Sequence, residues 1–196
     1  MNLLAHLFLA RAWPEDAQLG NFSADWVGGR RATQAYPAGF QAGVALHHRI
    51  DSFTDRHPVV AKTKARLREA GFGKYAPVIA DVFYDHFLAR DFSRWSPEEP
   101  LALFAQRQYA FLNRRRLDLP PGVQGFLPYM IEHDWLTGYA RPEGINRALA
   151  GLSRRASAGS GIEGAGAELM RHETAYAAEF AAFFPEILES TGVGER

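Results

Sequence analysis

Two largely apolar segments of this sequence each carry a pair of ionisable residues spaced four positions apart. The first segment holds His47 and Asp51 and the second holds Asp81 and Asp85, in each case among Ile, Leu, Val or Phe residues. Residues four apart lie one above the other on a helix, so each pair would share one face. Carboxylates and imidazoles that are buried must be paired or bind a metal. We therefore expect helices that surround a metal site.

The remaining sequence also predicts helices. Prolines, glycines and residues that can cap helices divide it into stretches with apolar residues at helical spacing. No stretch alternates apolar and polar residues for long enough to indicate a strand. We expect a single all-α domain over residues 1–196, a helical bundle with a Ser/Gly-rich loop at Ser157–Gly166. The expected helices cover residues 3–10, 14–28, 40–56, 58–70, 75–90, 97–116, 122–139, 142–156 and 163–190.

Charge and cysteine content exclude several classes of protein. The 22 basic and 22 acidic side chains give a formal net charge of zero, so nothing global indicates nucleic-acid binding. Because the sequence has no cysteine, zinc-thiolate sites, iron–sulfur clusters and a cysteine nucleophile are excluded.

The apolar run Leu3–Ala10 is far shorter than the roughly 20 residues that span a bilayer. We expect a cytoplasmic protein that does not bind a membrane.

The candidate metal ligands come from four predicted helices, as in metal sites built in the core of a helical bundle. They are His6, Asp25, His47, Asp51, Asp81, Asp85 and His86. A single His/Asp pair at helical spacing is usually an ion pair, but two carboxylates four apart repel unless a cation lies between them. Mixed His/Asp ligation suits Mn²⁺, Fe²⁺ or Zn²⁺. Such an ion neutralises a phosphate and activates a bound water, which favours phosphoester hydrolysis.

Other polar residues leave more than one interpretation open. Asn21 could bind phosphate, help to hold Asp25, or serve as a local cap. Arginines cluster at residues 30–31, 114–116 and 154–155. Such clusters are usually solvated, but here they could dock an acidic partner or bind a phosphate. Neither a phosphate-binding glycine loop nor a nucleophile elbow is present in the sequence.

Four motifs in register resemble those of the bacterial acyl carrier protein phosphodiesterases. They are the segments Met1–Leu7, Gly20–Asp25, His47–Asp55 and Asp81–Leu88. Later segments, such as Asp134-Trp135-Leu136 and Gly151–Arg155, fit more loosely, and the resemblance extends over nearly the whole chain. It implies an all-helical fold similar to that of the HD-type metal phosphohydrolases, although Asp85-His86 reverses the adjacent His-Asp of that group.

The resemblance also implies an activity. It is the hydrolysis, by attack of a metal-activated water, of the phosphodiester that joins 4′-phosphopantetheine to a serine of holo acyl carrier protein, an acidic partner of fatty acid biosynthesis. The ion would be Mn²⁺, with Mg²⁺, Fe²⁺ or Co²⁺ as alternatives. We expect the metal ligands to be His6, Asp25, His47, Asp51, Asp81 and Asp85. The expected catalytic residues are His86, Asp85 and Asp25, and the expected substrate-binding residues are Asn21, Arg49, Arg154 and Arg155.

The sequence leaves two other hypotheses open. One is an HD-like phosphohydrolase that acts on a small phosphodiester or a nucleotide. The other is a non-enzymatic helical binding protein in which the His/Asp pairs are structural.

Overall fold

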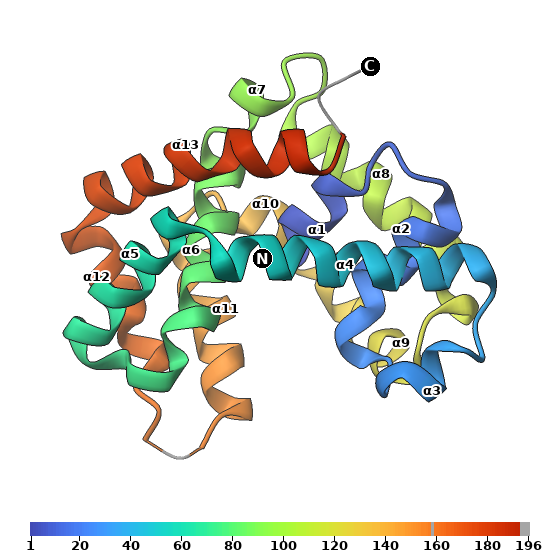
Figure 1. Ribbon diagram of the computed structural model, residues 1–196, viewed down its shortest axis with the longest axis horizontal. Coiled ribbons are helices and arrows are strands. Elements are labelled where there is room, and N and C mark those ends of the chain that lie inside the picture. Colours follow the sequence, from blue (N-terminus) through green and yellow to red (C-terminus); the bar gives the residue numbers. More distant parts are fainter. Residues whose placement is uncertain (158, 193–196) are drawn as a thin grey trace.

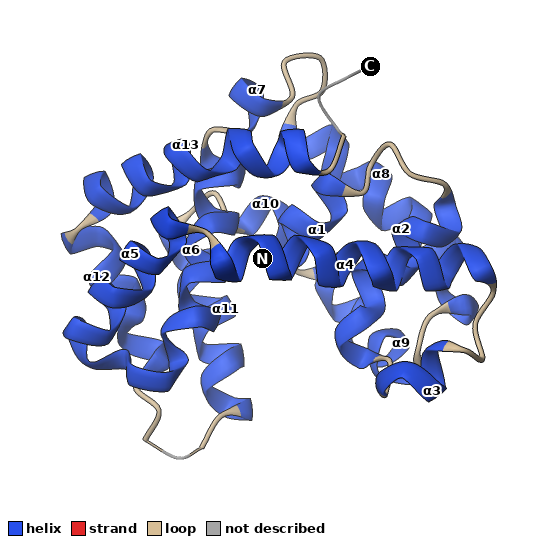
Figure 2. Cartoon of the chain, in the orientation of Figure 1, coloured by secondary structure: helices blue, strands red, loops and turns tan. Residues whose placement is uncertain are grey.

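The computed structural model describes residues 1–157 and 159–192, and within these residues the chain forms helices and no strand (Figures 1 and 2). The predicted all-α fold is confirmed. One hydrophobic core extends from Met1 to Ile187 and draws on helices from both halves of the chain. Among the described residues, no helix is long and apolar enough to cross a membrane.

Figure 1 shows α4 crossing the middle of the molecule, with α13 above it and α2, α3, α8 and α9 gathered at one end. The longer helices lie where the sequence predicts them, with ends shifted by a few residues. The α-helices are α1 (Leu3–Leu9), α2 (Glu15–Ser23), α3 (Gly29–Thr33), α4 (Ala38–Arg56), α5 (Pro58–Leu67), α6 (Ala76–Arg90), α7 (Phe92–Trp95), α8 (Leu101–Arg114), α9 (Pro121–Glu132), α10 (Trp135–Gly138), α11 (Pro142–Arg155), α12 (Ala165–Arg171) and α13 (Glu173–Ser190).

Two predicted helices are interrupted. The predicted helix 122–139 breaks at Asp134, which adopts a left-handed conformation with φ of 43°. The hydroxyl group of Tyr109 donates to Asp134 Oδ1 at 2.9 Å and accepts from the backbone N–H of Leu136 at 2.8 Å, so a side chain from α8 holds the break. The predicted helix 163–190 divides at His172 into α12 and α13.

The predicted second helix and the predicted loop also differ in detail. The second helix ends at Ser23 and tightens into a 3₁₀ turn, Ala24–Trp26, which carries Asp25. The predicted loop at 157–166 shortens because a 3₁₀ turn at Ile162–Gly164 leads directly into α12. Ala158, in the middle of that loop, lies outside the described residues.

Glycines allow α2 and α4 to touch backbone to backbone. A Cβ atom on Gly43 would lie 2.0 Å from the carbonyl oxygen of Ala17, and one on Gly20 would lie 2.0 Å from that of Phe40. Gly20 precedes Asn21, and Gly43 lies one turn before His47. The close approach therefore brings these two polar residues together.

The first helix, α1, is fixed by a carboxylate from α6. The backbone N–H groups of Leu4 and Ala5 donate to Asp85 Oδ2 and Oδ1 at 2.8 and 3.1 Å. This satisfies N–H groups that the first turn of a helix leaves free. Asn2, which directly precedes α1, does not cap it but donates from Nδ2 to the hydroxyl oxygen of Tyr139 at 3.0 Å. Asp85 thus sets the position of α1, and with it that of His6.

We expect Gly43→Ala to lower the free energy of unfolding by about 1–3 kcal/mol or more, because the new methyl group would overlap the backbone of α2. Urea unfolding followed by circular dichroism would measure this. Gly125→Ala in α9 is the matched control, since a Cβ atom there meets nothing within 4 Å. That change should raise the stability of an exposed helix by about 0.5–1 kcal/mol. Equal stability of the two variants would contradict the close approach of α2 and α4.

Candidate metal centre

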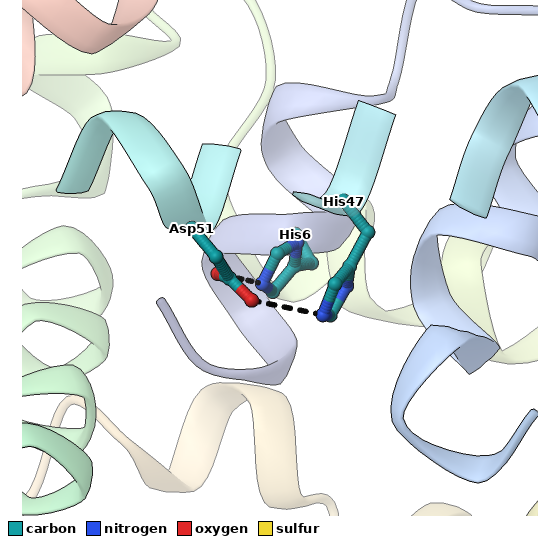
Figure 3. Close-up of side chains that lie close together, drawn as sticks. All are labelled: His6, His47 and Asp51. Atoms are coloured by element: carbon teal, nitrogen blue, oxygen red, sulfur yellow. Dashed lines mark ion pairs between the residues drawn. The ribbon is translucent and has the colours of Figure 1, made fainter. Parts of the chain in front are cut away.

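Two buried imidazole rings from different helices lie stacked on each other. His6 comes from α1 and His47 from α4, and their exposed fractions are 4% and 3%. The ring centroids are 4.0 Å apart and the ring planes differ by 12°. In Figure 3 the two rings lie side by side and face the carboxylate of Asp51.

Asn21 orients both rings. Its Nδ2 donates to the backbone carbonyl of His6 at 2.7 Å, so Oδ1 of Asn21 is left to accept from His6 Nδ1 at 3.3 Å. The backbone carbonyl of Asn21 accepts from Nδ1 of His47 at 2.9 Å. Both imidazoles thus use Nδ1 as a donor and direct Nε2 toward the acidic side chains. This is the arrangement in which a second group fixes the tautomer of a metal-binding histidine.

Carboxylates from two elements face these Nε2 atoms. Asp51 places Oδ2 3.0 Å from Nε2 of His47 and Oδ1 3.2 Å from Nε2 of His6. Asp25 Oδ1 lies 3.3 Å from Nε2 of His47. One ligand atom each from His6, His47 and Asp51 fall within 4.8 Å of one another, close enough to surround a single ion. We call these three residues the His/Asp centre.

The donor set and one buried atom fit a divalent cation. Among the described residues, Nε2 of His6 is buried and makes no hydrogen bond, although Asp51 is nearby. A buried polar atom without a partner is costly unless something else binds it. Two imidazoles and a carboxylate suit Mn²⁺, Fe²⁺, Co²⁺ or Zn²⁺. The His/Asp centre is therefore a candidate metal site with mixed nitrogen and oxygen ligands.

A second positive group lies beside the centre. The amino group of Met1 is 3.3 Å from Asp51 Oδ1 and 3.1 Å from Asp81 Oδ1. Burial disfavours its charged form, but the attraction of Asp81 and Asp51 outweighs burial and raises the pKa of the amino group to about 10. Asp81 thus joins the polar cluster through this ammonium.

The two imidazoles have opposite protonation tendencies. Burial lowers the pKa of His6, which favours the neutral ring. Burial also disfavours charge on His47, but the hydrogen bonds to Asp25 and Asp51 outweigh it and raise the pKa of His47 to about 9. Asp51 is desolvated as well, yet the hydrogen bond with His47 and the nearby amino group of Met1 hold its pKa far below the usual range. The hydrogen bond from His47 lowers the pKa of Asp25. A proton on His47 therefore occupies the position that a cation would take.

Three candidates from the sequence lie apart from the centre. Both oxygens of Asp85 accept from α1, and burial raises its pKa to about 7. His86 Nδ1 donates to the carbonyl oxygen of Tyr139 at 2.8 Å, and burial lowers the pKa of its ring. Arg49 extends over the ring of Trp13, its guanidinium carbon 5.5 Å from the ring centroid, and lines a different pocket. The structure therefore gives Asp85 the role of a helix cap and leaves His86 and Arg49 outside the site.

The structure also changes the role of Asn21, for which the sequence suggested contact with substrate. Its exposed fraction is 0%, and its polar atoms are used by His6 and His47. We assign it to positioning the rings.

The centre opens into a cavity of about 580 Å³. His6, His47, Asp25 and Asp81 line one part of it, and residues of α11 form another part of its wall. Arg154 and Arg155, predicted from the sequence, lie on that wall together with Arg147, which the sequence analysis missed. Helical spacing could have predicted Arg147, because residues 147, 151, 154 and 155 share one helical face. Cationic side chains thus line the same cavity as the His/Asp centre, and this cavity is large enough for a small molecule.

Fold and site together define an all-helical protein whose buried histidine–carboxylate centre suits a divalent cation. Comparison with known families then identifies it: the sequence model for the family described as acyl carrier protein phosphodiesterase matches residues 1–187, and the chain belongs to this family.

Curated relatives agree with this assignment. The chain is 34% identical over 188 residues to an acyl carrier protein phosphodiesterase of Enterobacter sp. (strain 638), with 96% of each chain covered. It is 33% identical over 189 residues to the protein of that name from Serratia proteamaculans (strain 568), again with 96% of each chain covered. Photorhabdus laumondii has a third such relative, 31% identical over 96% of this chain and 94% of its own. No solved structure matches the chain significantly, so the likeness to the HD-type fold stays a prediction.

We expect Asn21→Leu to lower the affinity for Mn²⁺ about 10- to 100-fold, because both imidazoles lose the group that orients them. Calorimetric titration with Mn²⁺ would measure the affinity, and circular dichroism would verify the fold. Asn113→Leu, at an exposed position of α8, is the matched control and should leave the affinity unchanged. A folded Asn21→Leu variant that binds Mn²⁺ as tightly as the wild type would refute this role.

We also expect a pH dependence in protein treated with a chelator. The pKa of His47 rises from 6.5 to about 9 on folding, so its stabilising charge is fully present below pH 6.5 and is lost as the pH rises through about 9. The free energy of unfolding should therefore decrease from pH 6.5 to 9. Metal affinity should increase over the same range, since the ion displaces this proton.

Urea unfolding at a series of pH values would test this expectation. His47→Gln should remove most of the decrease, whereas His48→Gln, an exposed change one residue away, should retain it. Identical pH profiles for wild type and His47→Gln would show that His47 does not carry the effect.

Proposed function

We propose that this protein hydrolyses the phosphodiester bond between 4′-phosphopantetheine and a serine of holo acyl carrier protein, releasing apo acyl carrier protein and 4′-phosphopantetheine. The main support is the His/Asp centre in a cavity that three arginines also line. The relatives carry the name acyl carrier protein phosphodiesterase. Acyl carrier proteins are acidic, so Arg147, Arg154 and Arg155 could bind the surface of the carrier protein as well as its phosphate.

The geometry of the His/Asp centre also indicates which residues would hold a divalent cation, for which we propose Mn²⁺. His6, His47 and Asp51 would bind it directly, because their ligand atoms already converge. Asp25 and Asp81 lie at the edge of the cluster and would complete it. Such an ion supplies charge neutralisation for the phosphate and a bound water of lowered pKa.

Other side chains of the cavity would bind the phosphate, accept a proton and balance charge. Arg147, Arg154 and Arg155 would bind the phosphate oxygens and hold the phosphorus close to the centre. Asp25 is ionised, and its side chain is 71% exposed. It would accept the proton that the attacking water loses. The charged amino group of Met1 offsets the surplus negative charge of Asp51 and Asp81.

We expect the purified protein with Mn²⁺ to remove the prosthetic group from holo acyl carrier protein, which mass spectrometry of the intact carrier protein would detect. Asp51→Asn should lose both Mn²⁺ binding and at least about 100-fold in kcat/KM, because Asp51 faces both imidazoles. Asp55→Asn is the matched control on the same helix. Asp55 pairs with Lys64 at 2.6 Å, away from the centre, and the variant should stay active.

The other outcomes distinguish the alternatives. Failure to release the prosthetic group at any metal concentration would reject the proposal. Cleavage of small phosphodiesters or nucleotides without cleavage of holo carrier protein would indicate a small-molecule phosphohydrolase. Unchanged metal content in Asp51→Asn, or no bound metal at all, would indicate a structural His/Asp pair in a binding protein.

A further inference from the structure

A continuous set of aromatic side chains lines the cavity beside the His/Asp centre. We call it the aromatic wall and define it as Trp26, Phe126, Tyr129 and Trp135. The ring centroids of Trp26 and Phe126 are 4.9 Å apart. Those of Phe126 and Trp135 are 6.0 Å apart with planes only 4° from parallel, and Tyr129 lies 5.9 Å from Trp135. These distances are typical of aromatic pairs in direct contact.

The aromatic wall is not part of the closed core. Trp26, Phe126 and Trp135 are only partly buried, and Tyr129 is 52% exposed. Glycine allows this placement: a Cβ atom on Gly122 would lie 2.8 Å from Cδ1 of Trp26, so Trp26 packs directly on α9. Several large rings that remain partly open to one cavity mark a site for a ligand with apolar parts.

The part of the cavity wall that α11 forms leaves room for such a ligand. On α11, the cavity-lining residues between Arg147 and Arg154 are Ala148, Gly151 and Leu152, of which the first two are small. A Cβ atom on Gly151 would meet only the tip of Arg154, at 3.8 Å. The cavity is therefore lined by cationic, carboxylate and aromatic side chains, and Ala148 and Gly151 add little bulk beside the arginines.

We propose that the aromatic wall binds the pantetheine arm of the substrate while the carrier protein stays outside the cavity. This inference rests on the proposed function. Of the two groups that the phosphodiester joins, a folded protein cannot enter 580 Å³, whereas ligands of the size of the arm occupy pockets of about 300–1,000 Å³. The arm carries two flat amides and a geminal dimethyl group, and these pack on the faces of aromatic rings.

Binding of the free product tests this inference apart from catalysis. Calorimetry would compare 4′-phosphopantetheine with inorganic phosphate on Mn²⁺-loaded protein. We expect the wild type to bind 4′-phosphopantetheine at least tenfold more tightly than phosphate. Trp135→Leu and Tyr129→Ala should each lower the affinity for 4′-phosphopantetheine about three- to tenfold. The affinity for inorganic phosphate should stay within about twofold of the wild-type value. Tyr129 is the safer change for folding, because it is half exposed.

Trp95→Leu is the matched control, a partly buried tryptophan that packs on Phe184 at 4.9 Å in a different part of the molecule. It should bind both ligands as the wild type does. A wild type that binds the two ligands equally would overturn the inference, and so would wall variants that keep full affinity or lose both ligands alike. The two proposals can also fail separately. If the aromatic wall contributes to the affinity for 4′-phosphopantetheine but the protein never releases this group from holo carrier protein, the proposed function is rejected and the binding role of the wall is retained.

Discussion

The hydrogen bonds of one buried asparagine are the constraint on which the rest of the site depends. Asn21 binds His6 through its amide and His47 through its backbone carbonyl, and so joins α1, α2 and α4 at one point. It can do so only because Gly20 and Gly43 let two helix backbones touch. The orientation of both imidazoles is thus a consequence of backbone packing, and loss of that packing would misalign the rings before any ligand was removed.

Much of the fold and part of the site could be predicted from the sequence, since both depend on local spacing. Helical periodicity located α4 and α6, and the interval between His47 and Asp51 placed both on one face, as the distance of 3.0 Å confirms. Helical phase could also have excluded Arg49. A residue two positions after His47 points to nearly the opposite side of the helix, and Arg49 indeed lies over Trp13.

The remainder depends on contacts between distant segments. Asp81 and Asp85 have the spacing of a ligand pair, but α1 begins against α6, and the free N–H groups of its first turn bind Asp85. Nothing in the spacing specifies which helix end will pack there. Asn21 was recognised as important, yet its role requires knowledge of three helices at once. The break at Asp134 is also nonlocal, because Tyr109 of another helix holds it.

The helix break at Asp134 lies in the part of the chain that forms most of the cavity wall, apart from the segments that form the His/Asp centre. Every residue of the His/Asp centre comes from the first third of the sequence, whereas the arginines and most of the aromatic wall come from α9 to α11. The turn at Asp134 lies between Phe126 and Tyr129 of α9 and Trp135 of α10. Substitutions in the later segment can therefore diversify what the cavity accepts while the reactive centre stays constant, so selectivity and chemistry can evolve separately.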